Sequence, residues 1–337
     1  MHRLLSLSCM KPNLLDALRQ NGINTVADFI SCDVDRLART ILVPSEDLSS
    51  LQKTVIAQAS AFTMNGSDFY EDMMSRFCIL SSGCDNLDEL LDGGLYTGEL
   101  TEIVGAAGVG KSQICMSIAM FTATETKNNV LYIDTGGSLS ATRIKEMLQG
   151  WNSSLDDQEV HDILSRISVI QAFDIFSVLE ALESVRQRIC NQGDDGDDDS
   201  TQHLRIIIVD SVAGVISPIL GGQQIHGHSL MVNLSRILKS LAVEHSVAVV
   251  ITNNVVTDSS KSSFSTKPAL GPTWAHVPNT RLFIQKNPAS QANSSEVERI
   301  ATLTKSSRQK LQVSSAFYID HGGLYSRRPV SQNLTQT

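Results

Sequence analysis

A glycine-rich segment ending in a lysine and a serine occupies positions 105–112. It reads Gly105-Ala-Ala-Gly-Val-Gly110-Lys111-Ser112, the complete pattern GxxxxGK[ST]. In this pattern the glycines let backbone N–H groups curl around an anion, and the start of the following helix adds partial positive charge. The Lys111 amine is expected to reach the β- and γ-phosphates, and the Ser112 hydroxyl to bind Mg²⁺. These residues predict a site for ATP.

The residues around this segment support the same interpretation. An apolar run at 100–104 predicts a strand before the loop, and residues 112–123 predict a helix after it. An accidental glycine-rich turn is the alternative, and the strand-loop-helix context argues against it. The expected nucleotide contacts come from Gly105, Ala106, Ala107, Gly108, Val109, Gly110, Lys111, Ser112 and Gln113.

A carboxylate ends a second apolar run, Ile206-Ile-Ile-Val209-Asp210. The carboxyl ends of parallel strands meet at one edge of a sheet, so Asp210 is expected beside the phosphate loop. There it would hold Mg²⁺ through water, with Ser112 as the other expected contact, and form the catalytic pair with Lys111. Asp134 also ends an apolar run, but Thr-Gly-Gly follows it, which favours a structural role.

Alternating strands and helices must position these residues. Apolar runs predict strands at 100–104, 130–134, 167–171, 206–210 and 247–252, with helices at 112–123, 174–190 and 229–245. Three later runs, at 281–284, 299–303 and 316–319, predict antiparallel strands that close the sheet. This alternation is typical of an α/β fold, with a mostly parallel twisted sheet covered by helices on both faces.

The chain is expected to divide into four segments. Residues 1–57 predict a small all-α N-terminal domain, in which Gly22 ends a helix and Thr25 and Asp28 form a capping box. Residues 58–77 contain Asn65-Gly66 and lose the helical pattern, which predicts a linker. Residues 78–325 form the predicted ATP-binding core, and residues 326–337 a flexible tail.

Composition excludes several classes of protein. The 337 residues include 27 basic and 36 acidic side chains, and no apolar run approaches the length of a membrane span. The short apolar start of the chain does not fit a secretory signal. The six cysteines form no CxxC pair, which argues against a zinc site or a disulfide framework and favours a reducing compartment.

Charge is distributed unevenly along the chain. Residues 193–200 hold five aspartates and predict a solvated loop, because the spacing of a calcium loop is missing. Residues 204–337 hold 13 basic and six acidic side chains, whereas the remainder is strongly acidic. This half can offer a positive face to nucleic acid; the alternative is an uneven, solvated surface.

The stretch that leads into the phosphate loop resembles the RecA-type recombinase family. It includes Ile79-Leu-Ser-Ser-Gly83, Gly93-Gly94 and Gly98-Glu-Leu-Thr101-Glu102-Ile103. Further family stretches follow in order at 130–134, 209–211, 249–253 and 280–282, so the resemblance covers roughly residues 79–320. It implies a RecA-like P-loop NTPase core. Four stretches, at 172–176, 217–224, 267–271 and 301–308, resemble the eukaryotic recombinase paralogues more than the strand-exchange recombinase.

The resemblance implies two DNA-binding loops, at about 218–227 and 254–270. The candidate contacts are Gln223, Gln224, Lys261 and Lys267. Because counterion release by cations supplies most of the affinity for phosphates, two lysines predict weak binding to single-stranded or branched DNA. Two flexible polar loops remain the alternative.

Three positions depart from the strand-exchange recombinases. The resemblance implies an acidic residue after the first glycine of the phosphate loop to orient the attacking water, and this chain has Ala106. Asn254 replaces the glutamine that senses the γ-phosphate. The polymerisation motif Phe-x-x-Ala is reduced to Phe62-Thr-Met-Asn65. These changes predict weak hydrolysis and disfavour long self-filaments.

Two cations near the last strands match a region that reaches a neighbouring subunit's nucleotide in relatives. The resemblance implies this trans-acting role for Lys305 and Arg308, and a surface basic pair is the alternative. A charge supplied in trans can contribute strongly to hydrolysis.

The resemblance implies an ATP-binding subunit of a nuclear recombinase-paralogue complex, with a weak DNA-dependent ATPase activity. The complex would assist homologous-recombination repair by promoting recombinase assembly on single-stranded DNA. Its partners would be other paralogues, including a C-type paralogue, and no membrane is expected. The alternative is a self-sufficient DNA-dependent ATPase or strand-exchange motor.

Overall fold

The computed structural model describes residues 12–23, 25–59, 63–191, 203–220, 225–257, 266–287 and 297–326. The chain divides into two compact units, with a boundary between Ser75 and Arg76. The predicted acidic loop at 193–200, Phe62 and residues 327–337 of the predicted tail lie outside the described residues.

Among the described residues of the N-terminal unit, four helices share one core: α1 (Pro12–Gln20), α2 (Val26–Ser31), α3 (Val34–Ile41) and α4 (Ser45–Ala59). The predicted capping box is present, since Asp28 N donates to Thr25 Oγ1 and Thr25 N donates to Asp28 Oδ2. Gly22 has a φ of 78°, as its place after α1 requires. Buried apolar side chains between the helices form a small core that includes Leu18, Phe29, Leu48 and Val55.

The segment predicted to be an irregular linker contains a helix, α5 (Gly66–Arg76). Asn65 caps it, because its Oδ1 accepts from Ser67 N and Asp68 N, both at 3.0 Å. The sequence pattern missed this helix because none of its side chains is buried. Without a buried face, apolar residues such as Phe69 and Met73 give no core-facing pattern.

A nine-stranded sheet forms the centre of the second unit, in the order β13-β12-β11-β10-β3-β7-β6-β4-β5. Its parallel strands are β3 (Leu100–Gly105), β4 (Asn129–Asp134), β5 (Ile167–Gln171), β6 (Leu204–Asp210), β7 (Ala248–Asn253) and β10 (Thr280–Lys286). The antiparallel strands β11 (Glu298–Lys305), β12 (Ser314–Asp320) and β13 (Gly323–Tyr325) extend one side. The predicted mostly parallel sheet is confirmed.

The predicted direction of the run 281–284 is correct on one side only. β10 pairs antiparallel with β11, as expected, but it lies parallel to β3, with Leu282 opposite Ile103. Between β7 and β10 lie β8 (Val255–Thr257), β9 (Thr266–Pro268) and α13 (Gly271–Ala275). This connection brings the chain back to the amino-terminal end of the parallel strands. A crossover connection of this kind permits parallel pairing.

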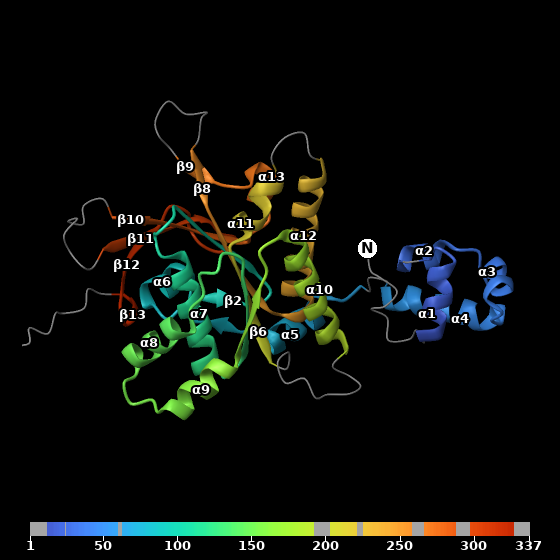
Figure 1. Cartoon of the computed structure of the whole chain (residues 1–337), viewed down its shortest axis with the longest axis horizontal. Helices are drawn as coiled ribbons and strands as arrows, with labels where there is room; N and C mark the ends of the chain where they lie inside the picture. Colours follow the sequence, from blue (N-terminus) through green and yellow to red (C-terminus); the bar gives the residue numbers. More distant parts are fainter. Residues whose placement is uncertain are drawn as a thin grey trace, which may run out of the picture. The chain divides into compact units, whose positions relative to one another are not determined.

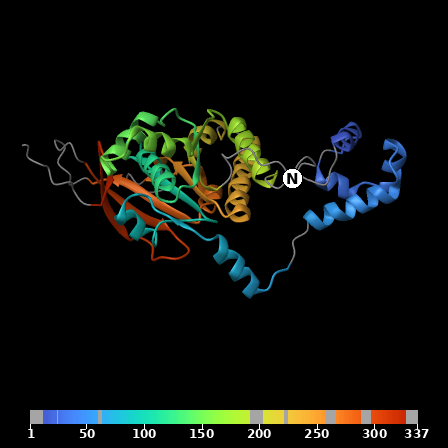
Figure 2. The same cartoon turned by 90° about the horizontal axis from the view of Figure 1, so that it is seen from below.

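Helices cover both faces of the sheet (Figure 1, Figure 2). One face packs against α6 (Asp85–Leu90), α7 (Lys111–Glu125), α8 (Ala141–Trp151) and α9 (Asp157–Ser165). The other packs against α10 (Ile175–Asn191), α11 (Val212–Ile216) and α12 (Ile225–His245), together with α13. The remaining elements are the pair β1 (Ile79–Leu80) and β2 (Leu95–Tyr96) and a short 3₁₀ turn at Ser217–Ile219. Two apolar layers thus fix the sheet edge where β3 and β6 end.

Candidate nucleotide site

The phosphate loop connects the end of β3 to the start of α7. Gly110 has a φ of 106°, and a Cβ there would collide with Ile319 of β12. A Cβ on Gly105 would collide with the Ile284 carbonyl of the adjacent strand β10. Glycine is therefore required at both positions, because it lets the loop backbone lie close to β10 and β12.

Lys111 begins α7 and folds back over the loop. Its Nζ donates to the Gly105 carbonyl at 2.8 Å and to the Ala106 carbonyl at 2.9 Å. Burial lowers the pKa of this amine, and the negative charge of Asp210 opposes that shift. The amine is held at the loop by two neutral carbonyls. Anionic phosphate oxygens are stronger acceptors, so they would replace these carbonyls as its partners.

Asp210 ends β6 and is almost fully buried. Its Oδ2 accepts from the Tyr132 hydroxyl at 3.0 Å and from the Ser138 hydroxyl at 3.1 Å, and its Oδ1 accepts from the Thr252 hydroxyl. Burial, followed by the nearby Cys115 and Asp210, raises the pKa of Tyr132, so this phenol remains a donor. The carboxylate is thus positioned by three hydroxyls, from β4, from β7 and from the loop that follows β4.

Ser138 connects the two predicted metal ligands. Its Oγ lies 3.4 Å from Ser112 Oγ and 3.1 Å from Asp210 Oδ2. The group contains only hydroxyl and carboxylate oxygens, which are the ligands that Mg²⁺ prefers. These residues fit the predicted ion, with Ser112 and Asp210 as its expected contacts.

Three of these side chains were not predicted from the sequence: Ser138, Tyr132 and Thr252. Tyr132 and Thr252 lie on strands that neighbour β6, so the rule that ligands gather at the carboxyl ends of parallel strands could have found them. Ser138 follows Asp134, whose Oδ1 accepts from Gly136 N and Ser138 N at 3.1 and 3.2 Å. Asp134 therefore shapes the loop that presents Ser138, in agreement with its predicted structural role.

Two arginines that were not predicted as site residues donate hydrogen bonds to Gln113 and to Val109. Arg143 of α8 donates through Nε to Gln113 Oε1 at 2.8 Å and through Nη2 to the Asp320 carbonyl at 2.6 Å. Arg299 of β11 donates through Nε to the Val109 carbonyl at 2.9 Å. Arg299 thus connects the phosphate loop, and Arg143 the first turn of α7, to the antiparallel side of the sheet.

Glu102 lies three residues before Gly105 but does not face the phosphate loop. It is fully buried, and its carboxylate accepts from Asn253 and Trp274 and pairs with Arg281. Trp274 belongs to the apolar layer on the α12 side of the sheet. With all its contacts on that side, Glu102 is not placed to orient water at the phosphate loop.

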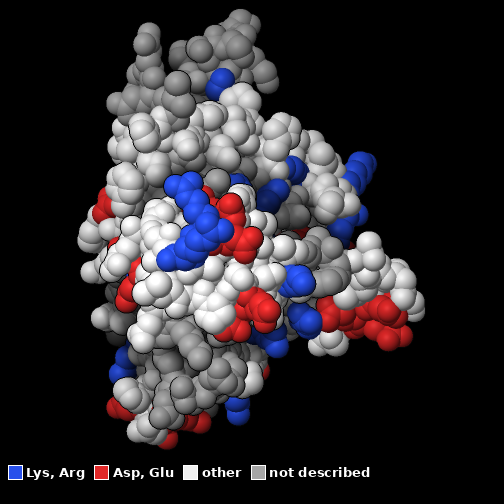
Figure 3. Space-filling view, turned by 90° about the vertical axis from the view of Figure 1, so that its right-hand side faces the viewer, with Lys and Arg blue, Asp and Glu red and all other residues white. Residues whose placement is uncertain are grey.

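Part of the predicted DNA contacts can be located. Gln223, Gln224 and Lys261 lie outside the described residues. Lys267 is exposed on β9, where it is paired with Val256 of β8. On the face drawn in Figure 3, basic and acidic side chains lie close beside one another.

Lys305 and Arg308 lie toward the other end of β3 from the phosphate loop. Lys305 pairs with Arg281 in the sheet, and its Nζ donates to the Ala275 carbonyl at 2.9 Å. Burial, together with the charges of Arg281 and Lys239, lowers the pKa of Lys305. Arg308 stacks 3.5 Å from the centroid of the Tyr96 ring and pairs with Glu99. Both cations are thus bound within their own chain, away from its own nucleotide site.

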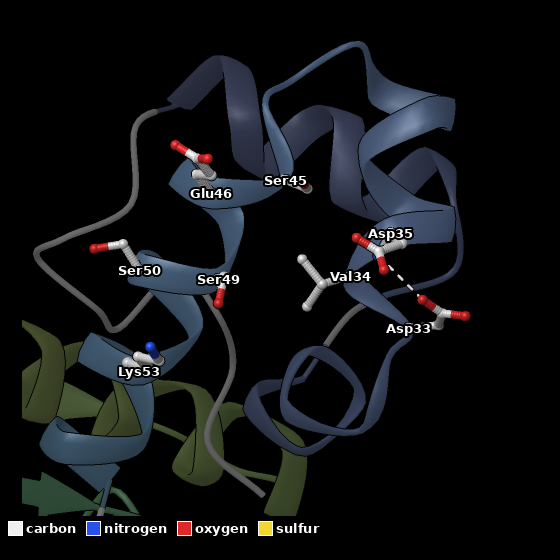
Figure 4. A pocket seen from close by; sticks show the side chains of 8 residues that line it. All are labelled: Asp33, Val34, Asp35, Ser45, Glu46, Ser49, Ser50 and Lys53. Carbon is white, nitrogen blue, oxygen red and sulfur yellow. Dashed lines mark hydrogen bonds between the residues drawn. The ribbon is translucent and has the colours of Figure 1, made fainter.

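A separate hollow of about 560 Å³ lies between the starts of α3 and α4 in the N-terminal unit (Figure 4). Its lining includes Asp33, Asp35 and Glu46, with Lys53 as its single cation. Three carboxylates would repel the phosphates of a nucleotide, so the phosphate loop is the better site.

Comparison with known proteins decides the family. A model described as Rad51 matches residues 74–324. The chain belongs to the Rad51 family. This family binds nucleotides, in agreement with the phosphate loop. A second model, described as the RAD51D N-terminal domain, matches residues 3–58.

Individual relatives agree with this assignment. The chain is 43% identical to DNA repair protein RAD51 homolog 4 of Bos taurus over 296 residues, 88% of each chain. It is 41% identical to the Mus musculus homolog 4, over 87% of this chain and 86% of that protein. DNA repair protein RAD51 of Saccharomyces cerevisiae is 29% identical over 68% of this chain and 56% of that protein. The resemblance to the eukaryotic recombinase paralogues is confirmed, and the matched N-terminal model and the homolog 4 relatives identify the D type as the paralogue that the chain resembles.

Proposed function

We propose that this chain is the ATP-binding subunit of a nuclear recombinase-paralogue complex. In this role it assists homologous-recombination repair of DNA breaks by promoting recombinase assembly on single-stranded DNA. The observation that carries the proposal is the chain of contacts from the phosphate loop through Ser112 and Ser138 to Asp210, in a protein of the Rad51 family. The relatives are named as DNA repair proteins, which supports a role in DNA repair.

The residues of the site have separate tasks. Backbone N–H groups of the phosphate loop and the Lys111 amine bind phosphate oxygens, and Ser112 and Asp210 hold Mg²⁺. The ion supplies neutralisation of phosphate charge when it is bound. Tyr132, Ser138 and Thr252 orient the Asp210 carboxylate. This set supports ATP binding, but among the described residues it provides no carboxylate to orient water.

Weak hydrolysis fits a subunit that works in a complex. No membrane-spanning helix is present in the part of the chain that the structure describes. Lys305 and Arg308 are candidates for acting on a neighbouring subunit's nucleotide, once they leave their present partners. A C-type paralogue is the expected neighbour, and DNA contact by this chain alone is weak.

The test is affinity purification of the tagged full-length chain from its own cells, followed by identification of bound proteins and assay of ATP turnover. Other recombinase paralogues should co-purify, and turnover per subunit should be higher in the complex than in the isolated chain. A chain that purifies alone, forms filaments with itself and hydrolyses ATP at the rate of the complex would instead be a self-sufficient motor.

A further inference from the structure

A buried carboxylate on β3 collects donors from three other elements. Glu102 Oε1 accepts from Asn253 Nδ2 at 2.8 Å and from Trp274 Nε1 at 3.0 Å, and Oε2 pairs with the Arg281 guanidinium. These partners come from β7, α13 and β10, respectively. A carboxylate in an apolar layer needs such partners, because burying it without them is very costly.

The same cluster joins both ends of the β8–β9 hairpin. Asn253 Nδ2 also donates to the Ala269 carbonyl at 3.2 Å, and Asn253 Oδ1 accepts from Asn254 N at 2.8 Å. Ala269 N in turn donates to the Asn254 carbonyl at 2.9 Å. Asn254 precedes β8 and Ala269 follows β9, so one side chain holds the base of the hairpin and contacts Glu102.

The end of α13 is fixed at the same place. The Ala275 carbonyl accepts from Lys305 Nζ at 2.9 Å and from Arg281 Nη2 at 3.4 Å. Trp274, the preceding residue, is almost fully buried. Figure 1 shows β8, β9 and α13 together at one end of the core. A fully satisfied buried network of this kind is rigid.

We propose that Glu102 is a positioning residue that anchors the β8–β9 hairpin and α13 to the strand carrying the phosphate loop. Glu102 lies three residues before Gly105, so the anchor fixes the hairpin relative to the nucleotide site. The hairpin belongs to the candidate DNA loop at 254–270, and its use for DNA rests on the proposed function. Trp274→Phe keeps an aromatic ring in this buried space and removes the Nε1 donor to Glu102.

The first test is hydrogen–deuterium exchange of the full-length chain carrying Trp274→Phe, which removes one donor to Glu102. Amides at Asn254 and Ala269 should exchange about tenfold faster than in the parent, while β4 and β5 keep their rates. The matched control is Trp151→Phe, which alters a half-exposed tryptophan packed on Phe121 and should change neither region. Unchanged exchange at the hairpin, or a uniform increase throughout the sheet, would overturn the anchor.

The second test separates a positioning role from general stability. Affinities for MgATP and for an oligo-dT strand are measured on the parent, Trp274→Phe and Trp151→Phe. Trp274→Phe should weaken oligo-dT binding at least threefold and leave ATP binding unchanged. Equal losses for both ligands, or no loss of DNA binding, would overturn the positioning role. If the parent binds no oligo-dT, the DNA part of the proposed function fails, and the exchange experiment still decides the anchor.

Discussion

Lys111 combines two properties that govern nucleotide binding, its contact with the phosphate loop and its burial. Its amine is 2.8 Å from the Gly105 carbonyl, and burial lowers its pKa from the ordinary value of 10.5. Phosphate oxygens would raise this pKa again, because a nearby negative charge favours the protonated amine. Nucleotide binding and protonation of Lys111 are therefore linked.

The first prediction follows from this linkage. Below the pKa of Lys111 in the free protein the amine is charged with or without ATP, so affinity should not depend on its titration. As pH rises through that pKa, binding requires uptake of a proton, and the Kd should increase by up to about tenfold per pH unit. Calorimetric titration between neutral pH and the ordinary lysine pKa measures this. Lys111→Arg, which stays charged, should remove the dependence; the same slope in both proteins would exclude Lys111 as its source.

The second prediction concerns the missing carboxylate. Among the described residues near the phosphate loop, Asp210 is assigned to Mg²⁺, Asp134 is occupied by backbone N–H groups and Glu102 is buried on the other face. Adding a carboxylate by Ala106→Glu, or by Gly136→Glu where a side chain has open space, should raise single-chain turnover. A positioned base is worth about 10²–10⁴-fold at best.

Ala107→Glu is the control for added charge, because it introduces the same side chain one residue further along an exposed part of the loop. Steady-state ATPase assays compare the turnover of the three variants with that of the parent. If neither Ala106→Glu nor Gly136→Glu exceeds the Ala107→Glu protein, slow turnover has a cause other than the missing carboxylate.

At the level of elements, the strands that carry the site were predictable and several of their contacts were not. The runs ending at Val104 and Asp210 are buried on both faces, so their composition alone indicated central strands. The direction of β10 was not predictable, because a buried apolar run looks the same in parallel and antiparallel pairing. Ser138 was not predicted because its contact with Asp210 depends on the conformation of a loop. That loop is shaped by the hydrogen bonds of Asp134.

The β8–β9 hairpin carries the third prediction. Lys267 is exposed on β9, and Lys261 belongs to the same candidate DNA loop. Replacing both by alanine should reduce the slope of log affinity for oligo-dT against log salt by about one to two, since each phosphate contact contributes roughly 0.7 for single strands. Binding is measured by fluorescence anisotropy over a salt series. A steep slope that persists in the double variant would place the DNA contact on another part of the basic C-terminal half.

At the level of the whole molecule, the chain divides into two compact units, and the first ends with a helix that buries no side chain. The boundary lies at the end of α5, between Ser75 and Arg76. The N-terminal unit has its own apolar core, and the second unit has one on each face of its sheet. The two family matches cover residues 3–58 and 74–324, so the second begins within the last turn of α5.

The fourth prediction uses this division. Limited proteolysis should cut first within residues 58–77 or within the acidic stretch 193–200, because proteases prefer exposed chain without packed side chains. Mass spectrometry of the early fragments locates the cuts. An initial cut between Leu100 and Ala123, inside the strand and helix that hold the phosphate loop, would contradict this organisation.

The most direct test of the account is calorimetric titration of the intact chain with MgATP, comparing the parent with Lys111→Ala. Lys111→Ala should weaken binding about 10–100-fold, since a charged hydrogen bond is worth about 1.5–3 kcal/mol. Its unfolding temperature should stay close to that of the parent, and Lys53→Ala, which changes an exposed lysine of the N-terminal unit, should bind ATP as the parent does. Equal affinity in the parent and Lys111→Ala, or no binding to either, would contradict the assignment of residues 105–112 as the nucleotide site.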